Sequence, residues 1–207
     1  MPSISIGDVT LAEGNAGTTA FTFSVTLSNT TDQTVTVNYQ TADGSATLAN
    51  NDYQAQGGSL TIPAKTAGGT ITVQVNGDTK REGDETFTVN LSSPVNATIA
   101  DGQGVGTITN DDGTPSITVA DVKVIEGNAG TVNAVFTVSL SNTTDQKVSI
   151  DYATANGSAT LANSDYAGAG GTLSIPPKTA SATITVAVNG DTKFEGDETF
   201  TLDLSIP

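Results

Sequence analysis

The stretch NGDTKREGDETFTVNLSSP at residues 76–94 returns almost unchanged as NGDTKFEGDETFTLDLSIP at residues 189–207. Both belong to a longer repeat with a constant offset of 113 residues, from Pro2 and Pro115 to Pro94 and Pro207, in which about two thirds of the positions are identical. Solenoid repeats have about 20 to 50 residues, whereas a unit of this length can bury a core of its own. The sequence therefore predicts two tandem domains of one fold.

Within the quoted stretch a turn is followed by a strand. Residues 76–84 are rich in Gly, Asp and Asn, which favour turns, and afterwards Phe87, Val89 and Leu91 alternate with polar residues. A period of two is typical of a strand with one buried face. About seven such strands per copy, without any helical period, predict an all-β protein made of two Greek-key immunoglobulin-like β-sandwiches. We expect them at residues 1–112 and 116–207, joined by a linker at 113–115.

The composition excludes several classes of function. The 207 residues include 22 Asp plus Glu but only 7 Lys plus Arg, for a formal net charge of -15, so we expect no nucleic-acid partner. No apolar run is long enough for membrane insertion. The absence of Cys and His excludes thiolate chemistry and the commonest general base, and the absence of Trp argues against an aromatic-lined glycosidase cleft. We therefore expect no enzyme.

Seven carboxylates of the first copy fall in turns or at strand ends, which meet at the poles of a sandwich. Hard cations such as Ca²⁺ take six to eight oxygen ligands from flexible loops, and clustered carboxylates repel one another unless a cation neutralises them. The alternative is a solvated acidic surface. The candidate metal ligands are Glu13, Asp43, Asp78, Glu82, Glu85, Asp111 and Asp112.

Several motifs resemble the Calx-beta domain, a module of sodium/calcium exchanger regulatory loops, integrin β4 and long bacterial surface proteins. They are EGNAG at 13–17, TADGSA at 41–46, DY at 52–53, the 76–87 segment and TITNDD at 107–112. The resemblance implies a Ca²⁺ cofactor held by the seven carboxylates named above. Asn110 stands where exchanger domains carry a third Asp, which predicts fewer or weaker ions. We interpret Asp52 and Asp84 as structural residues of their turns.

The second copy departs from this pattern. Asn156 replaces the Asp of the DG segment, and no closing Asp run is present, which leaves Glu126, Asp191, Glu195 and Glu198 as weaker candidates. The first copy continues after Pro94 into a final strand near residues 105–109, whereas the second stops at Pro207. We expect the second sandwich to lack its last strand, either because the chain is a fragment or because a neighbouring molecule donates the strand.

The sequence thus predicts a calcium-binding structural repeat of an extracellular or cell-surface protein. In this hypothesis Ca²⁺ rigidifies the junction between the domains, and the partners are calcium ions and neighbouring repeats of the same parent chain. Two alternatives remain open, an ion-independent spacer and an adhesive module that binds through a sandwich face.

Overall fold

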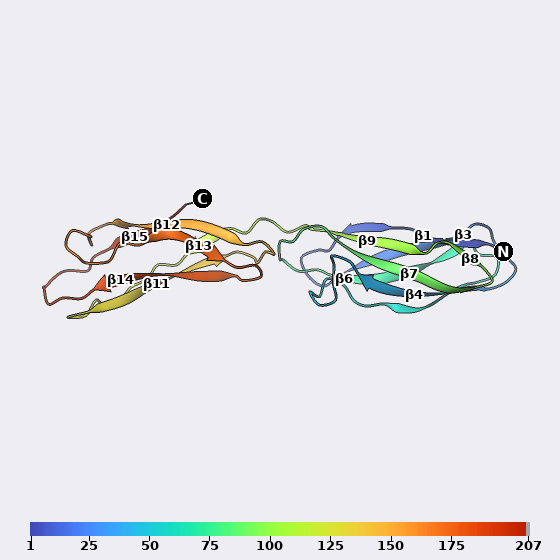
Figure 1. Ribbon diagram of the computed structural model, residues 1–207, viewed down its shortest axis with the longest axis horizontal. Helices are drawn as coiled ribbons and strands as arrows, with labels where there is room; N and C mark the ends of the chain where they lie inside the picture. The colour runs from blue at the N-terminus through green and yellow to red at the C-terminus, as the bar shows by residue number, and fades with distance from the viewer. Residues whose placement is uncertain (206–207) are drawn as a thin grey trace. The chain divides into compact units, whose positions relative to one another are not determined.

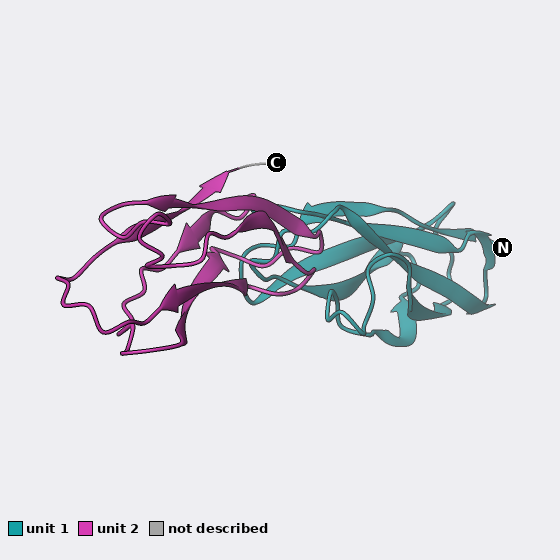
Figure 2. Cartoon of the chain, turned by 60° about the vertical axis from the view of Figure 1, so that its left-hand side comes forward, with its two compact units in different colours: residues 1–113 teal, residues 114–207 magenta. Residues whose placement is uncertain are grey.

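The computed structural model describes residues 1–205 and divides the chain into two compact units, Met1–Gly113 and Thr114–Pro207 (Figure 2). Both units are built from strands. Among the described residues there is no helix long and apolar enough to cross a membrane. Each unit is described below by itself.

Unit 1 is a sandwich of two sheets, in the strand orders β6-β3-β1-β8 and β2-β9-β7-β4-β5 (Figure 1). Most neighbours are antiparallel, but β1 with β8 and β2 with β9 are parallel pairs. The strands are β1 (Ser3–Ile6), β2 (Val9–Ala12), β3 (Thr18–Leu27), β4 (Val35–Asp43), β5 (Gly57–Ile62), β6 (Gly68–Asn76), β7 (Glu85–Val95), β8 (Thr98–Asp101) and β9 (Gln103–Thr109).

The core of unit 1 lies between the inner faces of these sheets. Strand β3 alternates between buried and exposed residues along most of its length, and its pattern follows the apolar alternation of the sequence. Phe87 lies at the centre of the core. Its ring stacks on Tyr53 with centroids 4.6 Å apart and contacts Phe21 and Phe23, each with a centroid distance of 5.9 Å. The quoted stretch therefore supplies the central aromatic residue of the fold.

Unit 2 repeats this sandwich with fewer strands, in the orders β10-β11-β14 and β13-β12-β15. Tyr166 stacks on Phe200 at 4.4 Å, and Phe136 meets the same ring edge-on at 6.0 Å. These three residues are the counterparts of Tyr53, Phe87 and Phe23. The strands are β10 (Ile117–Val119), β11 (Thr131–Leu140), β12 (Val148–Asn156), β13 (Gly170–Ile175), β14 (Ser181–Asn189) and β15 (Phe200–Ser205).

The all-β fold class is confirmed, but the expected strand number was wrong. Unit 1 has nine strands instead of about seven, because β1, β2 and β8 are four-residue segments too short to show a clear alternation. The final strand begins at Gln103, two residues before its predicted start. In unit 2 the described residues form six strands, and residues 122–125, the counterparts of β2, form none.

Candidate metal centre

The first carboxylate group joins two segments that are far apart in the sequence. Glu13 follows the end of β2, and Asp111 and Asp112 follow the end of β9. Because β2 and β9 are parallel neighbours with Ala12 opposite Thr109, both strands end at the same edge of the sheet. One carboxylate oxygen from each of the three residues lies within 4.8 Å of the others.

The second carboxylate group contains Asp52, Glu82 and Glu85, again with oxygens within 4.8 Å of one another. Glu85 is the first residue of β7, and Glu82 lies in the loop before it. Asp52 is buried, and its Oδ2 accepts a hydrogen bond from the Thr47 amide at 2.7 Å. Lys80 makes an ion pair with Glu82 in which both side chains are largely buried. The local sequence thus places one lysine ammonium group among these carboxylates.

The two groups share one electrostatic environment. Glu13 is only 3% exposed, and its pKa is raised from 4.5 to about 8, first by burial and then by the carboxylates of Glu82, Asp78, Asp112 and Asp111. Glu82 belongs to the second group, so a charge of the second group raises the pKa of a residue in the first. This concentration of negative charge around the buried Glu13 side chain favours a bound cation or a bound proton.

Asp112 strengthens this conclusion. Its pKa is raised by burial and by the carboxylates of Asp111 and Asp78. Its Oδ2 atom is buried and has no hydrogen-bond partner among the residues that the structure describes. Buried polar atoms are nearly always paired with protein, water or an ion, so this oxygen is available to a ligand.

Asn110 holds the two segments together. Its backbone amide donates to Asp84 Oδ1 at 3.1 Å, its side-chain oxygen accepts from the Glu82 amide at 3.0 Å, and its side-chain nitrogen donates to the Asp112 carbonyl at 3.0 Å. The loop before β7 and the segment after β9 are therefore fixed to each other. An Asp side chain could not donate the bond to Asp112. Asn110 is a positioning residue that the sequence reasoning treated only as a missing ligand.

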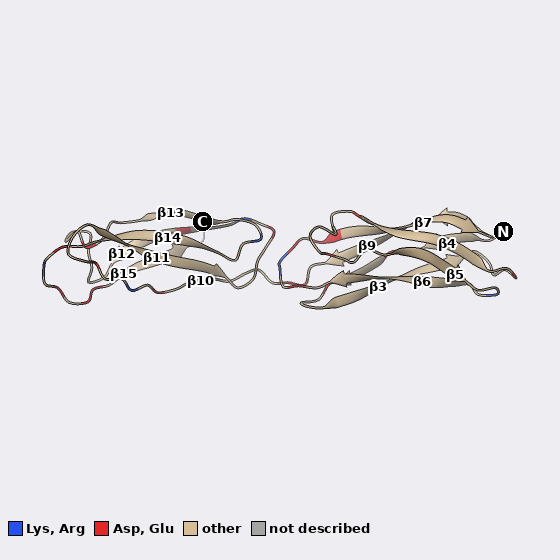
Figure 3. Cartoon of the chain, turned by 90° about the horizontal axis from the view of Figure 1, so that it is seen from below, with Lys and Arg blue, Asp and Glu red and all other residues tan. Residues whose placement is uncertain are grey.

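Two carboxylate groups also form in unit 2. They are Glu126 with Asp191 and Glu195, and Asp165 with Glu195 and Glu198, each with oxygens within 4.8 Å. Lys193 makes an ion pair with Glu195, as Lys80 does with Glu82 in unit 1. Unlike buried Glu13, its counterpart Glu126 is partly exposed. Asp and Glu residues, red in Figure 3, lie in loops of both units.

The family model of the Calx-beta domain matches residues 8–113 and residues 108–207. The chain belongs to the Calx-beta domain family. Each unit is one Calx-beta domain, and the resemblance expected from the motifs is confirmed. No curated protein matches the chain.

Among solved structures, the Calx-beta pair is similar to CBD12 from CALX1.2, with 22% identity and a TM-score of 0.49 over 98% of this chain and 79% of that one. It is also similar to the calcium binding domain CBD12 of CALX1.1, with 21% identity and a TM-score of 0.49 over 98% and 78% of the two chains. The apo-form Calx CBD1 domain shares 24% identity with a TM-score of 0.46 over 54% and 98%.

Two predicted ligands of the first Calx-beta domain lie outside both carboxylate groups. Asp43 Oδ1 accepts hydrogen bonds from the Tyr53 hydroxyl at 2.6 Å and the Leu48 amide at 3.2 Å. Burial and the bond to Asp43 raise the pKa of Tyr53. Asp78 is exposed and its Oδ1 accepts from the Lys80 amide at 2.6 Å. Both residues accept hydrogen bonds from backbone amides of their own turns. The negative charge of Asp78 also raises the pKa of Glu13.

The sequence predicts a structural role for Asp52, yet Asp52 and its counterpart Asp165 each belong to a carboxylate group. Each also has a structural role in its turn. Asp52 Oδ2 accepts a hydrogen bond from the Thr47 amide and Asp165 Oδ2 accepts one from the Thr160 amide, both at 2.7 Å. The signal that could have found them is the DY pair, which recurs at the same spacing in both Calx-beta domains. Their neighbours in the site come from a loop some thirty residues away (Glu82 and Glu195).

Proposed function

We propose that this chain is a calcium-binding structural module in which the first Calx-beta domain holds Ca²⁺ between Glu13, Asp111 and Asp112. The observation that carries the proposal is the convergence of these three carboxylates within 4.8 Å around a Glu that is 3% exposed. Three carboxylates this close together, one of them buried, repel one another, and a divalent cation removes that repulsion. The adjoining Asp52, Glu82 and Glu85 extend the same oxygen-rich surface.

The donor set fits Ca²⁺ better than other metals. All candidate ligands are carboxylate oxygens, and the chain has neither Cys nor His, which zinc and copper sites normally require. The residues also come from separate loops, as in the flexible sites that Ca²⁺ tolerates and Mg²⁺ avoids. The solved domain pair of CALX1.1 is described as a calcium binding domain.

The second domain offers a weaker site of the same kind, at Glu126, Asp191, Glu195, Glu198 and Asp165. Glu126 is partly exposed whereas its counterpart Glu13 is buried, and Asn156 stands in place of Asp43. Fewer buried charges mean weaker attraction for a cation. We expect the two domains to differ in affinity, with the first binding more tightly.

The position of Asp111 and Asp112 suggests a mechanical role. They lie directly before Gly113 and Thr114, where the first unit ends and the second begins. An ion held by these residues fixes the segment after β9 to the Glu13 turn and thereby restricts the hinge. In this proposal the chain is part of an extracellular or cell-surface array of such repeats, which stiffens when Ca²⁺ is present.

Isothermal titration calorimetry with CaCl₂ tests the binding. The wild-type chain should bind Ca²⁺, and the double substitution Asp111→Asn with Asp112→Asn should weaken the tighter site at least about thirtyfold, because two charged ligands are lost. Asp32→Asn, a charge removed from an exposed loop, is the matched control and should bind like the wild type. Absence of binding at millimolar Ca²⁺ would leave an ion-independent spacer instead.

Stiffening has a separate readout. The chain has no cysteine, so single cysteines placed on exposed positions of each unit can carry a donor and an acceptor dye. Ca²⁺ should narrow the distribution of transfer efficiencies measured on single molecules, and the Asp111/Asp112 double variant should show the same broad distribution with and without Ca²⁺. Binding without narrowing would retain the calcium site and reject the mechanical role.

A further inference from the structure

Lys80 places a positive charge among the carboxylates of unit 1. Its ammonium forms an ion pair with Glu82, and the two side chains are only 13% and 7% exposed. Lysine side chains are rarely this buried unless a partner compensates their charge. Lys65, in contrast, is exposed in the loop between β5 and β6. Lys80 is therefore a cation that the fold itself supplies to this part of the molecule.

Two hydrogen bonds fix the turn that carries the pair. The Lys80 amide donates to Asp78 Oδ1 at 2.6 Å, and the Glu82 amide donates to Asn110 Oδ1 at 3.0 Å. The backbone thus holds the ammonium and its partner in one loop, two residues apart. A tethered group has a high effective concentration at its partner and loses no translational freedom when it binds, in contrast to a free ion.

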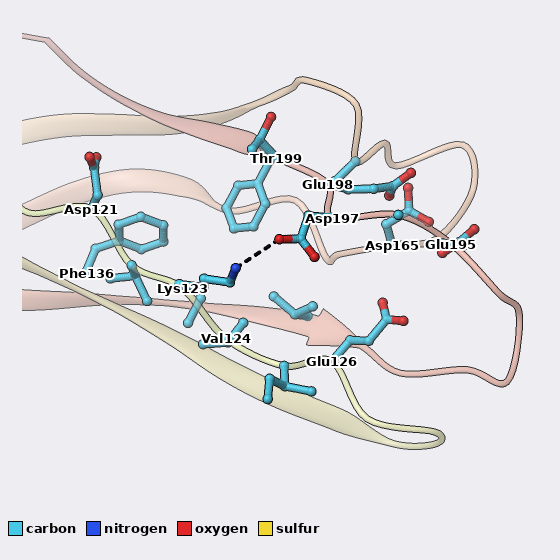
Figure 4. A pocket seen from close by; sticks show the side chains of 17 residues that line it. Asp121, Lys123, Val124, Glu126, Phe136, Asp165, Glu195, Asp197, Glu198 and Thr199 are labelled. Atoms are coloured by element: carbon cyan, nitrogen blue, oxygen red, sulfur yellow. Dashed lines mark hydrogen bonds and ion pairs between the residues drawn. The ribbon is translucent and has the colours of Figure 1, made fainter.

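The same turn recurs in unit 2. The Lys193 amide donates to Asp191 Oδ1 at 2.7 Å, and the Lys193 ammonium pairs with Glu195. Glu195 belongs to both carboxylate groups of unit 2, and Figure 4 shows it beside Asp165. In each unit the lysine therefore pairs with a carboxylate of a candidate metal centre. The pair in unit 2 is more open, since the Lys193 side chain is 61% exposed.

An ammonium group and Ca²⁺ compete for the same oxygens. The ammonium donates hydrogen bonds to carboxylates, and the ion coordinates them. In the second carboxylate group, oxygens of Asp52, Glu82 and Glu85 lie within 4.8 Å of one another. An ion bound there would share Glu82 with the ammonium and would lie close to a second positive charge. Breaking the buried pair to admit the ion would leave the lysine charge uncompensated.

The first carboxylate group has no such partner. Within residues 1–205, no basic side chain makes an ion pair with Glu13, Asp111 or Asp112. Asp112 Oδ2 is also buried without a hydrogen-bond partner among the same residues. The two groups therefore differ in kind, because the second contains a positive charge and the first does not.

We propose that the Lys80 ammonium takes the place of a metal ion in the second carboxylate group and thereby sets the number of Ca²⁺ ions that unit 1 holds. The inference rests on the proposed function, because it treats these carboxylates as ligands of Ca²⁺. It adds that unit 1 offers two places for a cation and that the chain fills one of them with its own side chain. Ca²⁺ then binds only between Glu13, Asp111 and Asp112.

The first test counts ions after Lys80→Met. Met has a similar length, carries no charge and offers no oxygen ligand. Calorimetric titration of the full chain with CaCl₂ should show one more ion bound per chain than in the wild type. Lys80→Gln repeats the count should the Met variant fail to fold. The same number of ions as in the wild type, at whatever affinity, overturns the proposal.

Two controls separate the position of the charge from its sign. Lys65→Met removes a positive charge from the exposed loop of the same unit, and Lys80→Arg keeps the charge in place. Both should bind as many ions as the wild type. A gain of an ion by Lys65→Met would show that the net charge of the unit controls binding, and this result would also overturn the proposal.

Combined variants locate the additional ion. Glu85→Gln added to Lys80→Met should remove it, whereas Asp111→Asn with Asp112→Asn added to Lys80→Met should keep it and remove the other ion. The opposite pattern overturns the proposal. If unit 1 of the wild type binds no ion and Lys80→Met gains one, the proposed function fails and the role of Lys80 stands. If the wild type binds and Lys80→Met gains none, the proposed function stands alone.

Thermal unfolding gives a second readout. In EDTA, Lys80→Met should lower the melting temperature of unit 1, because Glu82 loses its buried partner and three carboxylates remain without a cation. Ca²⁺ should then raise the melting temperature more in the variant than in the wild type, since one more ion binds the folded state. A purely structural role of Lys80 would lower the melting temperature equally with and without Ca²⁺, and that result overturns the proposal.

Discussion

Replacing Glu13 with Gln should change the stability of unit 1 in opposite directions with and without Ca²⁺. The substitution keeps the size of the side chain and removes its ability to carry a negative charge. Glu13 is 3% exposed and faces the carboxylates of Asp111 and Asp112 within 4.8 Å. Without a cation this charge opposes folding, and with a cation it is a ligand.

The magnitude follows from the pKa of Glu13, which is about 8 in the folded chain against an ordinary value of 4.5. At pH 7 the unfolded chain ionises this group and the folded chain mostly retains the proton. The difference costs at most about 3 kcal/mol of unfolding free energy, since each pKa unit corresponds to about 1.4 kcal/mol. In EDTA, Glu13→Gln should therefore stabilise unit 1 by up to about 3 kcal/mol.

With Ca²⁺ the order reverses. The wild type gains about 4.1 kcal/mol when the free ion is at 1,000 times its dissociation constant, which exceeds the cost of about 3 kcal/mol in EDTA. The variant loses most of this gain, because Gln offers one neutral carbonyl oxygen in place of a carboxylate. For a domain of this size, about 3 kcal/mol corresponds to a shift in melting temperature of about 10 °C or more.

Differential scanning calorimetry of the full chain at pH 7 measures both effects. The transition that shifts with Ca²⁺ in the wild type is assigned to unit 1. Glu126→Gln, the same change at the partly exposed counterpart in unit 2, and Asp32→Asn, in an exposed loop, are the controls and should leave that transition in place. A Glu13→Gln variant that is destabilised in EDTA, or that responds fully to Ca²⁺, would refute the reasoning.

Four further predictions concern the same unit. In EDTA the stability of unit 1 should fall as pH rises from about 4.5 to about 8, because the folded state holds a proton on Glu13 that the unfolded state has lost. Urea unfolding midpoints measured across this range test the slope. A flat profile contradicts the raised pKa. Over the same range Ca²⁺ binding should release protons, seen as a dependence of the calorimetric heat on the ionisation enthalpy of the buffer. Gly106→Val should cost about 1 to 3 kcal/mol in urea unfolding, since its Cβ would lie 2.5 Å from the Phe87 ring, and an unchanged midpoint would sink this packing argument. Asp43→Asn should change the unfolding free energy by no more than about 1 kcal/mol, since Asn accepts the same hydrogen bond from Tyr53, and a larger loss contradicts this role. Weaker Ca²⁺ binding at unchanged stability would identify Asp43 as a ligand, as the sequence predicts.

The repeat and its strands could be read from the sequence because both are local patterns. The 113-residue offset defines two equivalent domains, and the alternation around Phe87 marks a strand with one buried face. The acidic turns could also be assigned to a cation, because their charge is visible in the sequence. What these patterns lack is any measure of distance between turns.

Those distances depend on strand pairing. Glu13 meets Asp111 and Asp112 because β2 and β9 are parallel neighbours, although nearly 100 residues separate them. The same pairing explains the difference between the units, since residues 122–125 form no strand where β9 has no described counterpart.

The membership of the carboxylate groups was likewise decided by tertiary contacts. Asp52 joins Glu82 and Glu85, whereas Asp43 bonds to Tyr53, and Asn110 holds the surrounding loops. The sequence by itself determined the module and its duplication, and it predicts that Ca²⁺ is the ion. Only the folded chain decided which oxygens meet, because that depends on hydrogen bonds between strands that no local pattern records.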